Sequence, residues 1–285
     1  MFEKLLVPTD FSSATEKVLE YVGGLKKLGV EDVLLVHVSL RDGQEDMVLA
    51  ERERRISTRM QKEKKIVETM GLKARPLFLR GNPPDEILKL ATEENVSMIV
   101  SGSHGKGPLD EILMGSTSEK LGRESQTPVL LVRYGILEEK PKEMVQKFAT
   151  NAFKKVLFPT DFSTCSERAL RFIKEVLVGA GLAEVVLTHV VDDRHILTLS
   201  RREKLKKEHK ETLNKVRNRL RGPFKVSSHL LVGYPVAELL RLAGEKEVNT
   251  IVIGSHGKGI VKEAFLGSVS QNLIRMANKP VLVVH

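Results

Sequence analysis

Two glycine-rich segments combine residue types and spacing that suit the binding of a phosphate chain. Each reads Gly-Ser-His-Gly, then nine residues, then Gly-Ser, and the two segments span residues 102–116 and 254–268. Glycine can adopt positive φ and leaves room for a ligand where a Cβ would collide, and free amides at the start of a helix attract anions. The sequence has neither the Walker pattern nor the GxGxxG dinucleotide pattern, so these loops predict a nucleotide site of another type.

Within each loop, the closing serine and the amides that follow it are candidate phosphate contacts, although the serine could instead serve only as a helix cap. The loop histidines suit shape or hydrogen-bonding roles better than catalysis, because no acidic partner accompanies them. Lys106 and Lys258 could face either phosphate or solvent. The candidate binding residues of the two loops are Gly102, His104, Gly105, Gly115, Ser116 and Thr117, and Gly254, His256, Gly257, Gly267, Ser268 and Val269.

A second polar motif, Pro-Thr-Asp-Phe-Ser, ends the first apolar run of each copy. Its aspartate could accept a hydrogen bond from a ribose hydroxyl or from a base, or could form an Asx turn at the end of a strand. We expect the contact with a ligand. The candidate residues of this motif are Pro8, Thr9 and Asp10, and Pro159, Thr160 and Asp161.

The motifs recur because the chain contains an internal duplication. Three segments that begin at residues 4, 99 and 114 return in the same order, at offsets of 151 or 152 residues. Each copy alternates short apolar runs with helical patterns. The strands predicted in the first copy are 4–8, 32–38, 74–79, 98–102 and 128–132, and the second copy repeats all five.

Helix starts are predicted where Ser or Thr precedes Glu or Gln by three residues, as in a capping box. This spacing begins at Ser13, Thr164, Ser116 and Ser268. The longest helical pattern of the first copy covers about 45–70. It places these apolar residues near one face: Leu49, Ile56, Met60, Val67 and Met70.

Five strands that alternate with helices predict a parallel sheet with right-handed crossovers and helices on both faces. Ligands bind such a sheet beyond the carboxyl ends of the strands, where the winding reverses, and both motifs fall there. We therefore predict an α/β fold with two tandem Rossmann-like domains at residues 1–134 and 153–285. Residues 135–152, which include the charged run Glu-Glu-Lys-Pro-Lys-Glu, are the predicted linker.

The combination of Pro-Thr-Asp-Phe-Ser with Gly-Ser-His-Gly, nine residues and Gly-Ser resembles the ATP-binding branch of the universal stress protein family, which has an adenine nucleotide alpha hydrolase-like fold. The resemblance covers nearly all of both halves. It implies that backbone after the second strand, at Val38 and Val190, holds adenine. It also implies that Asp10 and Asp161 contact the nucleoside, and that the loop glycines and serines hold ribose and phosphates. Family members commonly pair through their last strands, so the two domains are expected to form an intrachain pseudo-dimer, and a further homodimer is left open.

The net charge of +9 raises the question of a nucleic-acid partner. The charge-dense stretches 51–65 and 201–210 interleave Glu with Lys and Arg and contain no aromatic residue, which is typical of solvated helix faces. We therefore expect no nucleic acid. No apolar run reaches the roughly 18 residues of a membrane helix, so no membrane association and a cytoplasmic location are expected. Cys165 is the only cysteine, which excludes an intrachain disulfide.

The expected ligand is ATP or AMP, with Mg²⁺ as a candidate companion of ATP, and an unidentified protein partner would respond to the bound state. The competing hypothesis is a weak ATPase or an enzyme of phosphoryl or adenylyl transfer. Such catalysis normally requires a positioned metal, a residue that orients the nucleophile and a cation at the developing charge. The motifs show no such set. The sequence therefore favours a regulatory, stress-response nucleotide-binding protein with one site per domain and slow or absent ATP hydrolysis.

Overall fold

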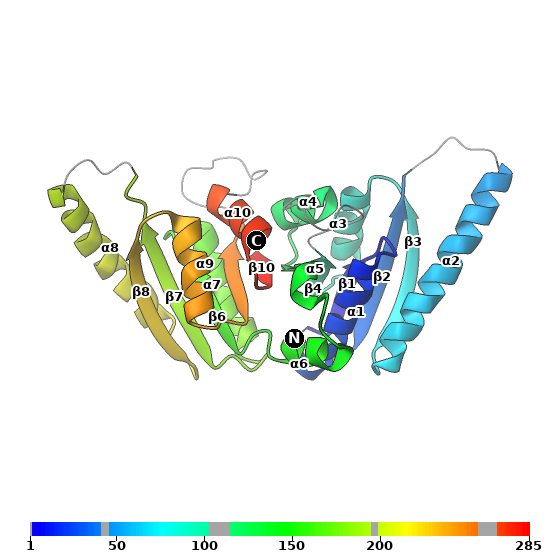
Figure 1. Ribbon diagram of the computed structural model, residues 1–285, viewed down its shortest axis with the longest axis horizontal. Coiled ribbons are helices and arrows are strands. Elements are labelled where there is room, and N and C mark those ends of the chain that lie inside the picture. The colour runs from blue at the N-terminus through cyan, green and yellow to red at the C-terminus, as the bar shows by residue number, and fades with distance from the viewer. Residues whose placement is uncertain (1, 41–45, 103–114, 195–198, 256–266) are drawn as a thin grey trace. The chain divides into compact units, whose positions relative to one another are not determined.

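A computed structural model describes residues 2–40, 46–102, 115–194, 199–255 and 267–285 of the chain (Figure 1). The chain divides into two compact units, Met1–Thr150 and Asn151–His285. Each unit is an α/β domain built from one copy of the sequence repeat.

The first unit has a parallel sheet in which the strands follow the order β3-β2-β1-β4-β5. Its central strands are apolar on both faces, and Leu5, Leu6 and Val7 of β1 are fully buried. This is the pattern of a parallel sheet covered by helices on both sides. The strands are β1 (Lys4–Pro8), β2 (Asp32–Ser39), β3 (Lys73–Arg80), β4 (Met98–Gly102) and β5 (Val129–Val132).

The second unit repeats this arrangement with the strand order β8-β7-β6-β9-β10, again with parallel pairing. Its strands are β6 (Lys155–Pro159), β7 (Glu184–Val191), β8 (Lys225–Val232), β9 (Thr250–Gly254) and β10 (Val281–Val284). The predicted α/β fold with a five-stranded parallel sheet in each half is therefore confirmed.

Helices cover both faces of each sheet (Figure 1). In the first unit α1 packs with α2, and α3 packs with α4. Right-handed crossovers place the two pairs on opposite faces, because the chain winds outward from β1 to β3 and then returns to β4 on the other side of β1. The helices are α1 (Ser13–Leu25), α2 (Asp46–Thr69), α3 (Pro83–Glu93), α4 (Ser116–Glu124), α5 (Tyr134–Leu137) and α6 (Lys142–Thr150), then α7 (Thr164–Phe172), α8 (Leu199–Arg219), α9 (Pro235–Glu245) and α10 (Ser268–Met276).

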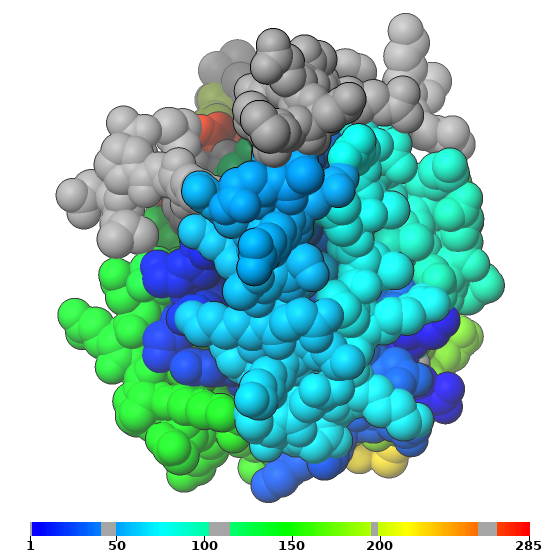
Figure 2. All heavy atoms as spheres, turned by 90° about the vertical axis from the view of Figure 1, so that its right-hand side faces the viewer, coloured from blue at the N-terminus to red at the C-terminus, as the bar shows by residue number. Residues whose placement is uncertain are grey.

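The long helix predicted at about 45–70 is confirmed as α2, which lies on the surface of the first unit (Figure 2). Ile56, Met60 and Val67 are buried, as the apolar periodicity indicates. Met70, just after the helix, is half-buried, and the side chain of Leu49 lies outside the described residues. The buried face also contains an acid, Glu63, which the periodicity did not predict.

The segment 135–152, predicted as the linker, is mostly helical, and the structure assigns it up to the end of α6 to the first unit. Helix α6 packs on α1, where Phe148 contacts the ring of Tyr21 edge-on at 5.9 Å. Gly24 permits the close approach, since a Cβ there would lie 2.3 Å from the carbonyl oxygen of Gln146. The segment between the two copies of the repeat is therefore not an extended linker: the charged run is followed by a helix whose apolar face is buried against the first unit.

The predicted starts of α1 and α7 at Ser13 and Thr164 are confirmed, but the capping role needs correction. The cap residues are Ser12 and Ser163, one position before the predicted ones, and each accepts a hydrogen bond from the amide three residues later at 3.3 Å. Both cap residues have extended backbone, so the helical conformation begins at the next residue.

Candidate functional site

The turn that follows β1, and its counterpart after β6, contain a residue in a backbone conformation that only glycine adopts readily. Phe11 and Phe162 have φ values of 62° and 63°. In the first unit, Thr9 Oγ1 accepts a hydrogen bond from the Phe11 amide at 3.0 Å, and Asp10 Oδ1 accepts one from the Ser12 amide at 3.0 Å. The same two bonds measure 3.1 and 3.0 Å in the second unit. Strain that is held by side chains at the end of a central strand marks a candidate functional turn.

The Asx turn proposed as an alternative role for the two aspartates is confirmed. Oδ1 of Asp10 and of Asp161 accepts from the amide two residues later, and Asp10 Oδ1 also accepts from Thr15 Oγ1 at 3.0 Å. These hydrogen bonds orient each aspartate carboxylate at the carboxyl end of its strand. Contact of either aspartate with a nucleoside stays a prediction.

A cavity of about 410 Å³ opens at the carboxyl ends of β6, β7 and β9 in the second unit. Its volume falls in the range of roughly 300–1,000 Å³ that is typical of small-molecule sites. Eight of the ten predicted positions of this unit line it: Pro159, Thr160, Asp161, Val190, Gly254, Gly267, Ser268 and Val269. The other two, His256 and Gly257, lie outside the described residues. The cavity therefore joins both sequence motifs and the end of the second strand of the repeat.

The sequence did not predict the other side chains that line this cavity. They come from β7, β9, the start of α7, α9 and α10: Ser166, Thr188, His189, Pro235, Leu239, Ile253, Ser270 and Leu273. Only the apolar ones follow from local periodicity, since they belong to the buried strand β9 or face the sheet from α9 and α10. The cavity thus has an apolar wall and a polar end, which is the usual composition of a ligand site.

The polar end of the cavity includes the start of α10. Gly267 is the cap residue, with φ −60° and ψ 144°, and no side chain of the described residues caps the helix. The same holds for α4, where Gly115 is the cap residue with φ −60° and ψ 136°. The alternative that Ser116 and Ser268 serve as helix caps is therefore wrong: both are first-turn residues with exposed side chains. Uncapped first-turn amides are suited to an anion.

The two cap glycines do not have the positive φ for which the sequence analysis considered glycine suited. Gly115 and Gly267 have negative φ, so only close approach of a ligand, and not a left-handed conformation, could require them. Gly254 has a packing role as well, since a Cβ there would lie 2.6 Å from the carbonyl of Cys165 at the start of α7.

Two serines that the sequence analysis did not single out fasten the helix after each loop to its strand. Ser118 Oγ donates to the carbonyl of Gly102 at 2.5 Å, and Ser270 Oγ donates to the carbonyl of Gly254 at 3.1 Å. Their recurrence two residues after Ser116 and Ser268 was the available signal. In the first unit, His104 and Gly105 lie outside the described residues, so the loop is described only at its two ends.

The histidines of β2 and β7 donate to backbone at the same turns. His37 Nδ1 lies 2.8 Å from the carbonyl oxygen of Thr9, and His189 Nδ1 lies 2.7 Å from that of Thr160. Because a carbonyl oxygen only accepts, Nδ1 carries the hydrogen in both rings. Nε2 of His189 is 2.9 Å from Nδ1 of His209 on α8.

Glu63 of α2 is the functional-site candidate that sequence analysis missed. Its side chain is 3 % exposed, and Oε1 accepts a hydrogen bond from Thr9 Oγ1 at 2.8 Å. Burial raises the pKa of Glu63 to about 7. The signal was its position between Met60 and Val67 on the buried face, but it lay in a charge-dense stretch that is typical of a solvated helix.

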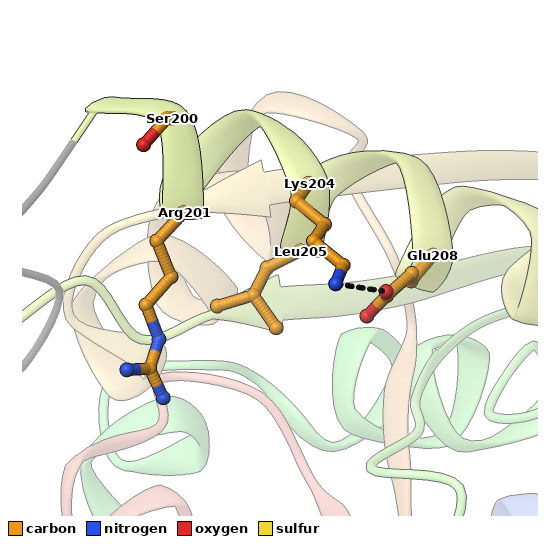
Figure 3. A pocket seen from close by; sticks show the side chains of 5 residues that line it. All are labelled: Ser200, Arg201, Lys204, Leu205 and Glu208. Carbon is orange, nitrogen blue, oxygen red and sulfur yellow. Dashed lines mark ion pairs between the residues drawn. The ribbon is translucent and has the colours of Figure 1, made fainter.

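A second hollow, of about 510 Å³, lies along the first turns of α8 and contains none of the predicted site residues. Figure 3 shows Lys204 paired with Glu208 along the helix, while Arg201 and Leu205 extend from it. The ion pair spans 4.0 Å and is exposed, so it contributes little to stability.

The described residues contain no group of three or more His, Cys, Asp or Glu side chains that could hold a metal ion. No helix in those same ranges is both long and apolar enough to cross a membrane.

Comparison with known sequences connects both units to one family. A model of the Universal stress protein family matches residues 1–133 and 152–285, so it matches the chain twice. A universal stress protein of Methanocaldococcus jannaschii is 38 % identical over 154 residues, which cover 46 % of this chain and 94 % of the relative. A universal stress protein of Bacillus subtilis is 33 % identical over 152 residues, which cover 47 % and 100 %.

A comparison with solved structures extends the likeness to the whole chain. The crystal structure of a universal stress protein from Archaeoglobus fulgidus is similar with a TM-score of 0.73 and 29 % identity. The match covers 100 % of this chain and 98 % of that one. The tandem arrangement of two such domains in one chain therefore occurs in a solved relative.

Proposed function

Because the chain belongs to the universal stress protein family, we propose that it is a regulatory protein that binds one ATP or AMP molecule in each unit. The observation that carries the proposal is the cavity of the second unit. There, the strained turn after β6, the end of β7 and the uncapped start of α10 meet around one space. These three elements supply an acid for ribose, backbone for a base and amides for phosphates.

In the proposed complex, adenine lies against the apolar wall and its edge meets the backbone of Val190. Asp161, held by its Asx turn, accepts a hydrogen bond from a ribose hydroxyl. The phosphates meet the amides of Ser268 and Val269, where the positive end of the helix dipole favours an anion. Mg²⁺ belongs to the proposal only with ATP, as an ion held largely by phosphate oxygens. The first unit binds through the matching residues of its own motifs.

Three further expectations stay predictions of the family resemblance. These are the pairing of the two domains through their last strands, a protein partner that responds to the nucleotide, and a cytoplasmic location.

Titration calorimetry of the full chain with ATP and with AMP tests the proposal. We expect two nucleotides per chain. Gly267→Val should remove one of them and Gly115→Val the other, because a branched side chain at the cap position blocks the approach of phosphate to the first-turn amides. Loss of about two charge-assisted hydrogen bonds predicts at least roughly 100-fold weaker binding at the altered site.

The structure makes this substitution selective. The extended backbone at Gly115 and Gly267 suits a β-branched residue, so the variants should fold. Gly244→Val is the matched control, because a Cβ at this exposed position of α9 meets nothing within 4 Å. Unchanged ATP affinity in both folded loop variants would show that phosphates do not bind at these helix starts and would sink the proposal.

A further inference from the structure

Glu63 is a buried acid whose hydrogen bonding is incomplete. It lies on the inner face of α2 and is 3 % exposed. Oε1 accepts from Thr9, and Oε2 has no hydrogen-bond partner among the residues that the structure describes. An ionised carboxylate would place charge on a buried oxygen without a donor, which is costly, whereas the neutral acid avoids that charge.

The surrounding charges act in both directions on this acid. Burial is the largest cause that raises its pKa from 4.5 to about 7, and the negative charges of Glu16 and Asp10 add to the rise. The hydrogen bond from Thr9 and the positive charge of Lys62 lower it. Lys62 is itself engaged with Glu16 at 2.8 Å, so the net field at Glu63 favours the protonated acid.

Two further titratable or charged groups approach the same turn from neighbouring elements. Arg59 of α2 lies over the ring of Phe11 at 5.7 Å. The ring of His37 of β2 lies against the ring of Phe11, tilted by 30° with centroids 4.4 Å apart, and its Nδ1 donates to the carbonyl of Thr9.

The link from Glu63 to the proposed nucleotide site is the hydroxyl of Thr9. Because Thr9 Oγ1 accepts from the amide of Phe11, its own hydrogen is directed to Glu63. The acid thus fixes the hydroxyl that holds the strained turn, one residue from Asp10. A nucleotide bound at this turn brings several negative charges close to Glu63.

The second unit has no equivalent acid. Along the inner face of α8, Leu205, His209 and Val216 match the spacing of Ile56, Met60 and Val67. The position that corresponds to Glu63 is then Thr212, whose hydroxyl donates to the carbonyl of Glu208 within the helix.

We propose that Glu63 is a proton-linked positioning residue of the first unit's nucleotide site, and that it takes up a proton from solvent as the anionic nucleotide binds. The inference rests on the proposed function of this site. An ionised Glu63 repels the phosphates, so binding to the first unit tightens as pH falls from 8 to 6. In turn, the bound nucleotide favours the neutral acid.

Calorimetry with ATP on the full chain carrying Gly267→Val, which silences the second unit, tests the linkage. Titrations at pH 7 in two buffers of different ionisation enthalpy give the protons taken up. The chain with Glu63 should take up roughly half a proton more than the same chain with Glu63→Gln. As pH rises from 6 to 8, the affinity for ATP should fall by a factor roughly three to ten times larger in the chain with Glu63 than in the chain with Glu63→Gln. The nucleotide's own phosphate titrates near about pH 6, and the paired comparison removes that contribution.

Glutamine keeps an acceptor for Thr9, so a proton-linked role predicts near-normal binding with a flattened pH profile. Glu68→Gln, at an exposed position of the same helix, is the control and should leave the profile unchanged. Equal proton uptake in the two chains, or loss of binding by Glu63→Gln at every pH, would overturn the inference. A ¹³C titration of the Glu63 carboxyl separates the two proposals. A midpoint near 4.5 without nucleotide overturns the inference, whereas failure of ATP to bind at any pH overturns the proposed function of this unit and the linkage with it.

Discussion

Each unit has a threonine at the equivalent position of the turn after its first strand, but the two hydroxyls donate to different partners. In the first unit, Thr9 donates to Glu63, which lies 54 residues away on another helix, at 2.8 Å. In the second, Thr160 donates to Ser166, only six residues away, at 3.1 Å, and Ser166 donates onward to the carbonyl of Ser163. The turn of the first unit is therefore coupled to α2, whereas this hydroxyl in the second unit is satisfied locally.

The second unit couples its turn to α8 by another route. His189 donates to the turn carbonyl through Nδ1 and contacts His209 of α8 through Nε2. In the first unit, His37 Nε2 lies 3.4 Å from Ser39 Oγ of its own strand. Duplication thus preserved the Pro-Thr-Asp-Phe-Ser and Gly-Ser motifs and changed the hydrogen-bond partners of the turn. The two sites are therefore expected to respond differently to pH.

The charge of the chain is distributed just as unequally. Residues 1–150 contain 23 Lys and Arg against 24 Asp and Glu, whereas residues 151–285 contain 23 against 13. The whole positive excess therefore belongs to the second unit. A field of this sign favours the approach of a polyanion, and salt weakens it.

Replacement of Glu63 should produce the largest difference between the units. The folded-state pKa of about 7 exceeds the ordinary value of 4.5, so the folded chain retains a proton that the unfolded chain loses between these pH values. Stability conferred by the neutral acid is complete below pH 4.5 and is lost as pH rises to about 7. Relative to Glu63→Gln, the wild type should lose up to about 3 kcal/mol over this range and change little above it.

Chemical denaturation at pH 5, 6, 7 and 8 measures this difference, with Glu68→Gln as the exposed control on the same helix. Parallel pH dependences in the wild type and in Glu63→Gln would show that the acid is ionised in the folded protein. The two turns would then differ in their hydrogen-bond partners but not in the protonation of a buried acid.

Much of this architecture follows from local sequence. The strands at 4–8 and 98–102 were predicted at their observed bounds, because short apolar runs between polar turns are typical of buried parallel strands. Because both motifs recur at strand ends, eight of the ten candidate residues of the second unit line one cavity. Local patterns succeed here because the motifs are tied to the ends of regular elements.

Long-range contacts account for what the sequence could not predict. Glu63 and His209 lie in charge-dense helices, and only the packing of α2 and α8 on the sheets shows that these side chains face inward. Helix α6 was hidden because it begins within the charged run 138–143, although its buried Val145 and Ala149 have helical spacing. The position of Glu63 on the apolar face of α2 was a local signal, but a charge-dense pattern does not distinguish a buried acid from a solvated one.

Removal of the hydroxyl of Thr9 or of Thr160 should give a smaller difference in stability between the two units. Thr9→Val leaves the Phe11 amide without its acceptor and removes the hydroxyl that donates to Glu63, at a cost of about 2 kcal/mol. Thr160→Val leaves the Phe162 amide without its acceptor, but Ser166 keeps its bond to Ser163, so about 1 kcal/mol is expected. Hydrogen exchange at the two phenylalanine amides, together with denaturation, measures each cost. Equal costs at pH 8 would contradict the coupling of the first turn to α2.

The smallest effect is expected for the contact between His189 and His209, which couples the turn of the second unit to α8. Since His189 donates through Nδ1, its Nε2 accepts in the neutral ring, and His209 Nδ1 must donate to it. His209→Met introduces the residue type found at the matching position of the first unit. It removes the donor to Nε2 of His189, whose side chain is largely buried. The predicted cost is about 1 kcal/mol at pH 8. Lys210→Met, at the exposed neighbouring position, should cost almost nothing and controls for the introduced side chain. ¹⁵N spectra of the histidine rings supply the second readout: His189 should keep its hydrogen on Nδ1 in the variant, because the carbonyl of Thr160 still requires a donor. A shift of that hydrogen to Nε2 would mean that His209, and not the turn, fixes the ring.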